Sequence, residues 1–150
     1  MQRYTSQSQR AFLKLLRTLV STYHRLIELD AHYLRSSGLT QTQFDIIATL
    51  GNTEGMVMRE LSEKTLISKG ALTGVVDRLQ EKGLVQRKNN PNDRRSTIIA
   101  LTRKGDGVFV KVFPKHVEAL GNHFKTMKRS EMAEALHSLE RLSACLEKPH

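Results

Sequence analysis

The chain has 150 residues, the length of a single domain, and its 24 lysine and arginine residues against 15 aspartate and glutamate residues give a formal net charge of +9. This basic excess favours an anionic partner such as nucleic acid. The single cysteine excludes a disulfide framework, the N-terminal stretch lacks the apolar core of a signal peptide, and no apolar run approaches the roughly 18 residues of a membrane span. We therefore expect a cytoplasmic protein with no membrane partner.

The first predicted element is a long helix from about Ser8 to Ser36, ended by Gly38. Apolar side chains recur along it at helical spacing. They are Phe12, Leu15, Leu16, Leu19, Tyr23, Leu26, Ile27, Ala31 and Leu34. Because an isolated helix derives most of its stability from packing, part of this stripe is expected to face another element or another chain.

Two short helices are predicted next. The first begins with a capping box, in which Thr40 caps the helix and Gln43 reaches back to it, and it ends at Gly51-Asn52. The second spans Met58–Leu66 and has a weaker start, because the Val57 side chain cannot accept a capping hydrogen bond.

A third helix, Ser68–Gln80, follows a tight turn and completes a helix-turn-helix. Ser68 is a good N-cap and Gly83 stands where a left-handed C-cap belongs. Its apolar stripe is Leu72, Val75, Val76 and Leu79. The opposite face carries Lys69, Thr73, Asp77 and Gln80, with Gly70 and Gly74 beside them. This small, polar face suits a helix that reads base edges in a major groove, although an ordinary amphipathic surface helix has the same stripe.

A β-hairpin is predicted over residues 84–88 and 96–101, two short β-branched runs that flank the turn formers of residues 89–95. Residues 82–104 hold seven basic side chains and one acidic one, so the positive charge is concentrated here. A helix-turn-helix followed by a basic hairpin is typical of a winged helix, whose wing can enter a minor groove.

The C-terminal third is predicted to be helical. Thr102 caps one helix, which Pro114 should kink, and Ser130 caps the last one. The expected fold class is mainly α: an α+β winged helix-turn-helix with a two-stranded wing, flanked by long N- and C-terminal dimerisation helices. Residues 1–37 and 103–150 would form the helical dimerisation region, and residues 38–102 the DNA-binding lobe, within one intertwined domain.

The chain resembles the MarR family of bacterial winged-helix transcriptional regulators from about Gln9 to Lys148. The resemblance is carried by residues 39–44 (LTQTQF), 68–73 (SKGALT), 77–85 (DRLQEKGLV) and 93–95 (DRR), followed at the family's spacing by Leu101-Thr102 and Gly105. Val57 and Gln80 depart from the family's usual residues at their positions. The resemblance implies a homodimer that binds double-stranded DNA at a near-palindromic operator, most commonly as a repressor, and that responds to small aromatic or carboxylic effectors.

The DNA contacts that the resemblance implies fall on the third helix and the wing. Those at or near base edges are Ser68, Lys69, Gly70, Thr73 and Asp77. Arg78 would be a phosphate or intramolecular partner, and Arg95 would enter the minor groove while Asp93 orients the wing by pairing with an arginine. The contacts to the DNA backbone would be Arg87, Lys88 and Arg94.

Three further features each allow two interpretations. Arg17 and His24, seven residues apart on the first helix, could offer donors to an effector carboxylate, or could simply face solvent or an interface. Cys145 could sense oxidation, or be a small packed residue near the last apolar stripe. The histidines, including His116 and His123, lack the spacing of a metal site and are expected at the surface or an interface.

No nucleophile elbow, phosphate-binding glycine loop or zinc spacing is found, so we expect neither an enzyme nor a cofactor or metal. The alternatives to a sequence-specific regulator are an architectural protein that binds DNA without sequence preference, and a redox-sensing regulator acting through Cys145.

Overall fold

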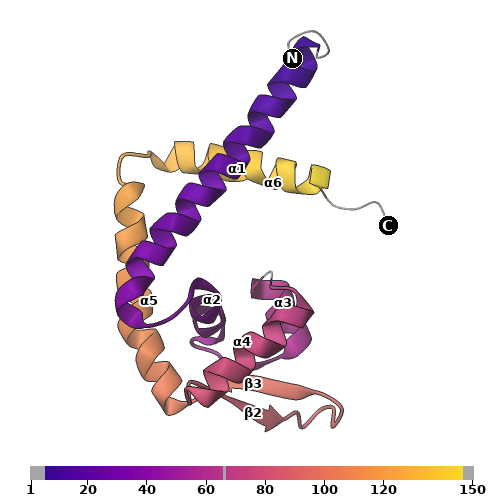
Figure 1. The fold of residues 1–150 in the computed structure, drawn as a ribbon, viewed down its shortest axis with the longest axis vertical. Coiled ribbons are helices and arrows are strands. Elements are labelled where there is room, and N and C mark those ends of the chain that lie inside the picture. Colours follow the sequence, from indigo (N-terminus) through magenta and orange to yellow (C-terminus); the bar gives the residue numbers. More distant parts are fainter. Residues whose placement is uncertain (1–5, 66, 147–150) are drawn as a thin grey trace. The chain divides into compact units, whose positions relative to one another are not determined.

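The computed structural model describes residues 6–65 and 67–146 and is mainly helical, with one small sheet (Figure 1). A short 3-10 turn, Arg35–Ser37, follows the first helix. The elements in chain order are α1 (Gln7–Leu34), α2 (Gln41–Leu50), β1 (Met56–Val57), α3 (Met58–Thr65), α4 (Lys69–Glu81), β2 (Val85–Asn89), β3 (Thr97–Leu101), α5 (Arg103–His123) and α6 (Arg129–Leu146). The predicted winged helix-turn-helix with flanking helices is confirmed. The chain divides into two compact units, one up to His116 and one from Val117 onward.

Helix α1 begins slightly earlier than predicted, because Ser6 and not Ser8 marks its start. The Ser6 amide donates to Gln9 Oε1 at 2.7 Å, and the Gln9 amide donates to Ser6 Oγ at 3.2 Å, which closes a capping box. The 3-10 turn that follows the helix is capped by Gly38, whose φ of 68° is the left-handed value that glycine adopts without strain.

Helices α2, α3 and α4 form the predicted helix-turn-helix. The capping box of α2 is confirmed: the Gln43 amide donates to Thr40 Oγ1 at 3.3 Å, and the Thr40 amide donates to Gln43 Oε1 at 3.2 Å. The turn before α4 is held by the Ser62 hydroxyl, which donates to the Ile67 carbonyl at 2.7 Å. Leu66, the predicted end of the second helix, lies outside the described residues.

The sheet has the strand order β1-β3-β2, with antiparallel pairing throughout. In the wing, Val85 pairs with Leu101 and Asn89 with Thr97, so each strand begins one residue later than predicted. The third strand, β1, pairs Met56 with Ile99 and was missed by the sequence reasoning. Two residues are too few to show an alternating pattern, and β1 is held only by its long-range partner.

The hydrophobic core of the described residues lies between Leu34 and Phe109. Ile46, Leu61 and Ile99 are completely buried within it. The first turn of α5 lies so close to the wing that a Cβ on Gly105 would stand 2.0 Å from the Leu84 carbonyl oxygen. Only glycine therefore fits at this position, and the absence of a side chain there allows α5 to start close against Leu84.

The two C-terminal helices differ in how well their starts were predicted. Thr102 caps α5, because the Gly105 amide donates to its Oγ1 at 3.0 Å. The prediction that Ser130 caps the last helix was wrong: α6 begins at Arg129, so Ser130 lies inside it, and the Lys128 amide donates to Glu131 Oε2 at 2.7 Å. A carboxylate in the first turn also interacts favourably with the helix dipole. Helix α5 continues past Pro114, and the kink there stays a prediction.

Large apolar side chains are exposed along the flanking helices. In α1 they include Phe12, Tyr23 and Leu26. None of the described residues of α6 is buried, and its Leu136 and Leu139 are more than half exposed. Within the described ranges, no helix is both long and apolar enough to cross a bilayer.

Candidate nucleic-acid interface

Helix α4 buries one face and exposes the other, as the sequence predicts. Leu72, Val76 and Leu79 are completely buried, and Val75 is nearly so. The Ser68 hydroxyl accepts from the Ala71 amide at 3.4 Å and caps the helix. The exposed face at this end of the helix carries Ser68, Lys69, Gly70 and Thr73. The helix therefore presents a short run of polar groups and free N-terminal amides, which suit base edges and phosphate.

Gly70 is not required by packing. A Cβ built at this position would meet no atom within 4 Å, and Gly70 does not have a positive φ. A glycine inside a helix costs roughly 0.5–1 kcal/mol relative to alanine. The missing side chain thus gives the folded chain no gain, but it keeps the exposed face of α4 flat where another molecule can approach.

Two predicted contact residues bind each other. Arg87 Nη2 lies 2.6 Å from Asp77 Oδ1, and Arg87 Nη1 donates to Gln80 Oε1. Asp77, expected at a base edge, and Arg87, expected on the DNA backbone, are therefore joined in the free chain. Arg78 differs, since the described residues place no carboxylate within 4 Å of its guanidinium.

The wing extends its basic side chains outward. Lys88, Arg94 and Arg95 are exposed. Asp93 was expected to pair with an arginine, and its Oδ1 does accept from Arg95, but from the backbone amide, at 2.9 Å. An aspartate that binds the amide two residues on forms a local turn, and this local bond is made without ordering a long arginine side chain. The bond is local to the turn, and the Arg95 guanidinium takes no part in it.

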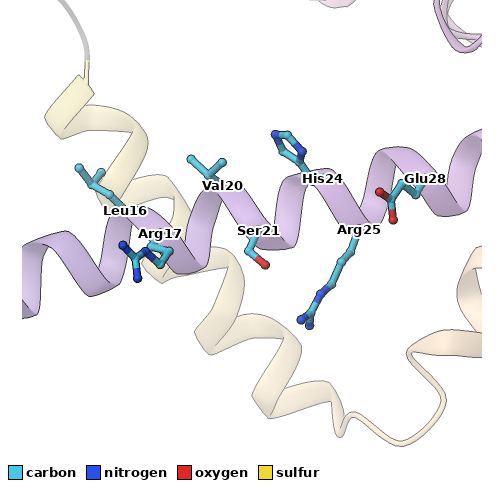
Figure 2. Close-up of a pocket in the computed structure, with 7 residues that line it drawn as sticks. All are labelled: Leu16, Arg17, Val20, Ser21, His24, Arg25 and Glu28. Carbon is cyan, nitrogen blue, oxygen red and sulfur yellow. The ribbon is translucent and has the colours of Figure 1, made fainter.

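The predicted effector residues Arg17 and His24 both line a surface depression along α1, with a volume of about 570 Å³ (Figure 2). Leu16 and Val20 add apolar surface to it, and Arg25 adds a second guanidinium that the sequence reasoning missed. The sequence reasoning chose His24 because it lies seven residues after Arg17 on the helix, and it did not consider the next residue, Arg25. The depression combines cationic donors with apolar walls, which suits a small apolar acid.

His116, expected at the surface or an interface, is instead buried within the chain. Its side chain is 7% exposed, and its Nε2 lies 3.3 Å from Asp30 Oδ1. Its ring packs against Phe44 with 4.4 Å between centroids. The cluster joins α1, α2 and α5, so no local sequence pattern reports it. Burial raises the pKa of the neighbouring Asp45 carboxyl, and Asp30 raises it further, whereas His116 lowers it.

Cys145 is exposed on α6, so its interpretation as a packed residue does not hold within the chain. The described residues contain no group of three or more histidine, cysteine, aspartate or glutamate side chains that could hold a metal ion.

A polar recognition helix beside a basic wing, both mounted on one buried core, defines a winged helix-turn-helix DNA-binding protein. The MarR family model matches residues 39–97. The HTH-type transcriptional regulator MhqR of Bacillus subtilis is 28% identical over 130 residues, which cover 87% of this chain and 90% of MhqR.

Solved structures agree with this assignment. AbsC, a MarR family transcriptional regulator from Streptomyces coelicolor, matches with a TM-score of 0.83 at 27% identity, covering 96% of this chain and 97% of AbsC. A mutant MarR from E. coli, complexed with operator DNA, matches with a TM-score of 0.78 at 25% identity, covering 91% of this chain and 99% of that one. The winged helix-turn-helix of residues 39–97 thus matches the MarR family of transcriptional regulators, and the likeness to family members extends over most of the chain, as expected of a DNA-binding regulator.

Proposed function

We propose that this regulator is a cytoplasmic homodimer that represses transcription by occupying a near-palindromic operator, and that a small aromatic or carboxylic acid releases it. The observation that carries the proposal is the polar face of α4, on which Lys69, Gly70 and Thr73 are exposed, with the basic wing following it in the chain. Likeness to a family member complexed with operator DNA supports the same use of this surface.

The contacts to DNA are proposed in three groups. Ser68, Lys69, Gly70 and Thr73 approach base edges in the major groove, because these short or flexible side chains surround the free N-terminal end of α4. Arg95 enters the minor groove, where the negative potential favours arginine. Phosphates are contacted by Arg78, Lys88 and Arg94.

Dimerisation through residues 1–37 and 103–150 is supported by the apolar side chains that α1 and α6 leave exposed. Burying them against a second copy would remove this surface from water. A two-fold dimer would place two copies of residues 38–102 on successive major grooves about 34 Å apart, and this spacing is why the operator is proposed to be near-palindromic.

Effector release is supported by the depression along α1. Arg17 and His24 offer donors to a carboxylate, and Leu16 and Val20 offer apolar surface to a ring. The two half-sites of an operator have a fixed spacing, so the two lobes must keep a matching spacing to bind both. A ligand that binds more tightly to a conformation with another lobe spacing would therefore lower the affinity for DNA.

The test is in vitro selection from a random DNA pool, repeated with a panel of phenolic and carboxylic acids. A sequence-specific regulator should prefer its selected duplex over random DNA by about 10³ or more at physiological salt. Equal binding to both would favour the architectural alternative. If no acid lowers retention, or if Arg17→Ala leaves the response to an active acid unchanged, the effector proposal fails.

The role of the wing can be tested with Arg95→Ala. This change should weaken binding to all duplexes by about tenfold and reduce the slope of log affinity against log salt by about 1, because one phosphate-neutralising charge is lost. Exposed Arg141 on α6 is the control, since Arg141→Ala should change neither value. An unchanged salt slope for Arg95→Ala would exclude this role.

A further inference from the structure

The Arg87 side chain connects the middle of the wing to the recognition helix. Arg87 stands at the centre of β2 and pairs across the sheet with the completely buried Ile99. Its guanidinium binds the Asp77 carboxylate at 2.6 Å and the Gln80 amide oxygen, two acceptors that lie three residues apart on α4. Strand β2 is thus tied to the core through its backbone and to α4 through one side chain.

We propose that Asp77, Gln80 and Arg87 form a clamp that sets the angle of the wing relative to the recognition helix, and that these residues position the two DNA-reading elements without reading bases themselves. The inference rests on DNA binding by α4 and the wing, and it replaces the direct DNA contacts first expected of Asp77 and Arg87.

The geometry suits positioning. A guanidinium is planar and presents its N–H groups as a rigid fork, so binding two acceptors at once fixes its orientation as well as its distance. Helix residues three apart face the same side, so Asp77 and Gln80 offer their oxygens to one partner. A rotation of β2 away from α4 would break both hydrogen bonds together, and the tip at residues 90–95 would move with the strand.

The charges lead to the same conclusion. The Asp77 side chain is 49% exposed on the helix that approaches DNA, where an unpaired carboxylate would be repelled by phosphates. Arg87 compensates that charge, and it is itself only 34% exposed. A guanidinium already paired with a carboxylate releases no counterion from DNA, so Arg87 should contribute nothing to the salt dependence of binding.

A double-mutant cycle on the full chain tests the clamp, with DNA affinity measured at several salt concentrations for Asp77→Ala, Arg87→Ala and the double variant. We expect each single variant to lose about tenfold, and the double variant to lose no more than either, because the residues act as one unit. The salt slope of Arg87→Ala should equal that of the wild type. Lys88→Ala, the next residue on the same strand, is the control and should reduce the slope by about 1.

Three results would overturn the clamp. Additive losses would make Asp77 and Arg87 independent, a lower salt slope for Arg87→Ala would make Arg87 a phosphate contact, and a changed preference at one base pair for Asp77→Ala would make Asp77 a base reader. Gln80→Glu keeps an acceptor for Arg87 and should bind more tightly than Gln80→Ala. The cycle can be run on any duplex, so a wild type without sequence preference would overturn the operator proposal and leave the test of the clamp intact.

Discussion

The segment from Leu34 to Phe109 differs from the helices on either side of it in how far its apolar side chains are buried. All of the buried hydrophobic residues among those described lie within that segment. The large exposed ones stand at or before Leu26, or at or after Val110. The central segment, with α2, α3, α4 and the sheet, therefore supplies its own core, whereas α1, α6 and the outer part of α5 carry apolar surface that the described chain does not bury.

This difference separates two sources of stability. The core of the winged lobe is internal, so its stability should depend little on protein concentration. Burial of the flanking helices, in the proposed dimer, depends on a second chain and therefore on concentration. DNA affinity should depend on both, since pairing two lobes makes the second half-site contact effectively intramolecular.

The largest expected effect comes from placing charge on the exposed apolar face of α6. The variant Leu136→Glu/Leu139→Glu should make the protein monomeric, because two carboxylates would have to be buried in the interface. Affinity for the selected duplex should then fall by about 100-fold or more, as avidity is lost. Sedimentation and DNA titration measure the two effects. Ser138→Glu on the same helix is the control, and a doubly substituted variant that remains dimeric would contradict the proposed interface.

The next largest effect, on stability, is expected from the substitution of His116. This side chain is buried although it lies beyond Phe109, the last buried hydrophobic residue of the described chain. His116→Ala removes a buried side chain that packs on Phe44 and whose Nε2 lies 3.3 Å from Asp30 Oδ1. We expect the free energy of unfolding to fall by about 2–4 kcal/mol, measured by denaturant titration. The exposed His137 on α6 is the control. Equal effects of His116→Ala and His137→Ala would mean that the internal core ends before His116.

A smaller effect is expected at Gly70, where one substitution should raise stability and lower DNA affinity. Gly70→Ala should stabilise the folded chain by about 0.5–1 kcal/mol, because its Cβ meets open space. The same methyl group should weaken DNA binding, since it projects from the face proposed to meet the groove. Gly107→Ala in α5 also places a Cβ in open space and should stabilise without affecting DNA binding. Unchanged affinity of Gly70→Ala would remove Gly70 from the interface.

The smallest expected effect is a pH dependence of the free energy of unfolding that arises from Asp45. Burial and the neighbouring Asp30 raise the pKa of this carboxyl above its ordinary value of 3.8, so folding favours its protonated form. The ionised group therefore opposes folding at neutral pH. Asp45→Asn should raise the free energy of unfolding at pH 7, with a gain that shrinks toward zero as pH falls to 3.8 and below. Glu118→Gln, at an exposed site on α5, should show no such trend. A gain in stability that does not change with pH would contradict a raised pKa of Asp45 as its cause.

Local signals were enough to predict much of this fold. The caps at Thr40, Ser68 and Thr102 depend on neighbours within three residues, and the buried stripe of α4 depends on helical periodicity. The end of α4 was predicted from Gly83, whose φ is 69°. Each of these features is determined by residues close together in the sequence, which explains the accuracy.

Features built from distant residues were missed. Strand β1 is held by a partner more than 40 positions away in the chain. The His116 cluster brings together Asp30, Phe44 and His116 from three helices, and the Arg87 clamp crosses from a strand to a helix. At the candidate interface, the exposed residues of α4 could be chosen from the sequence, but the pairing that removes Asp77 and Arg87 from that set required the fold.

One measurement tests most directly the account of a self-sufficient lobe paired through its flanking helices. The chain is titrated into its selected duplex and into the same duplex lengthened by about five base pairs between the half-sites, at one salt concentration. That insertion turns one half-site by about half a helical turn, so a rigid pair of lobes cannot engage both. The account predicts a loss of affinity of about 100-fold or more. Equal affinity for both duplexes would contradict it.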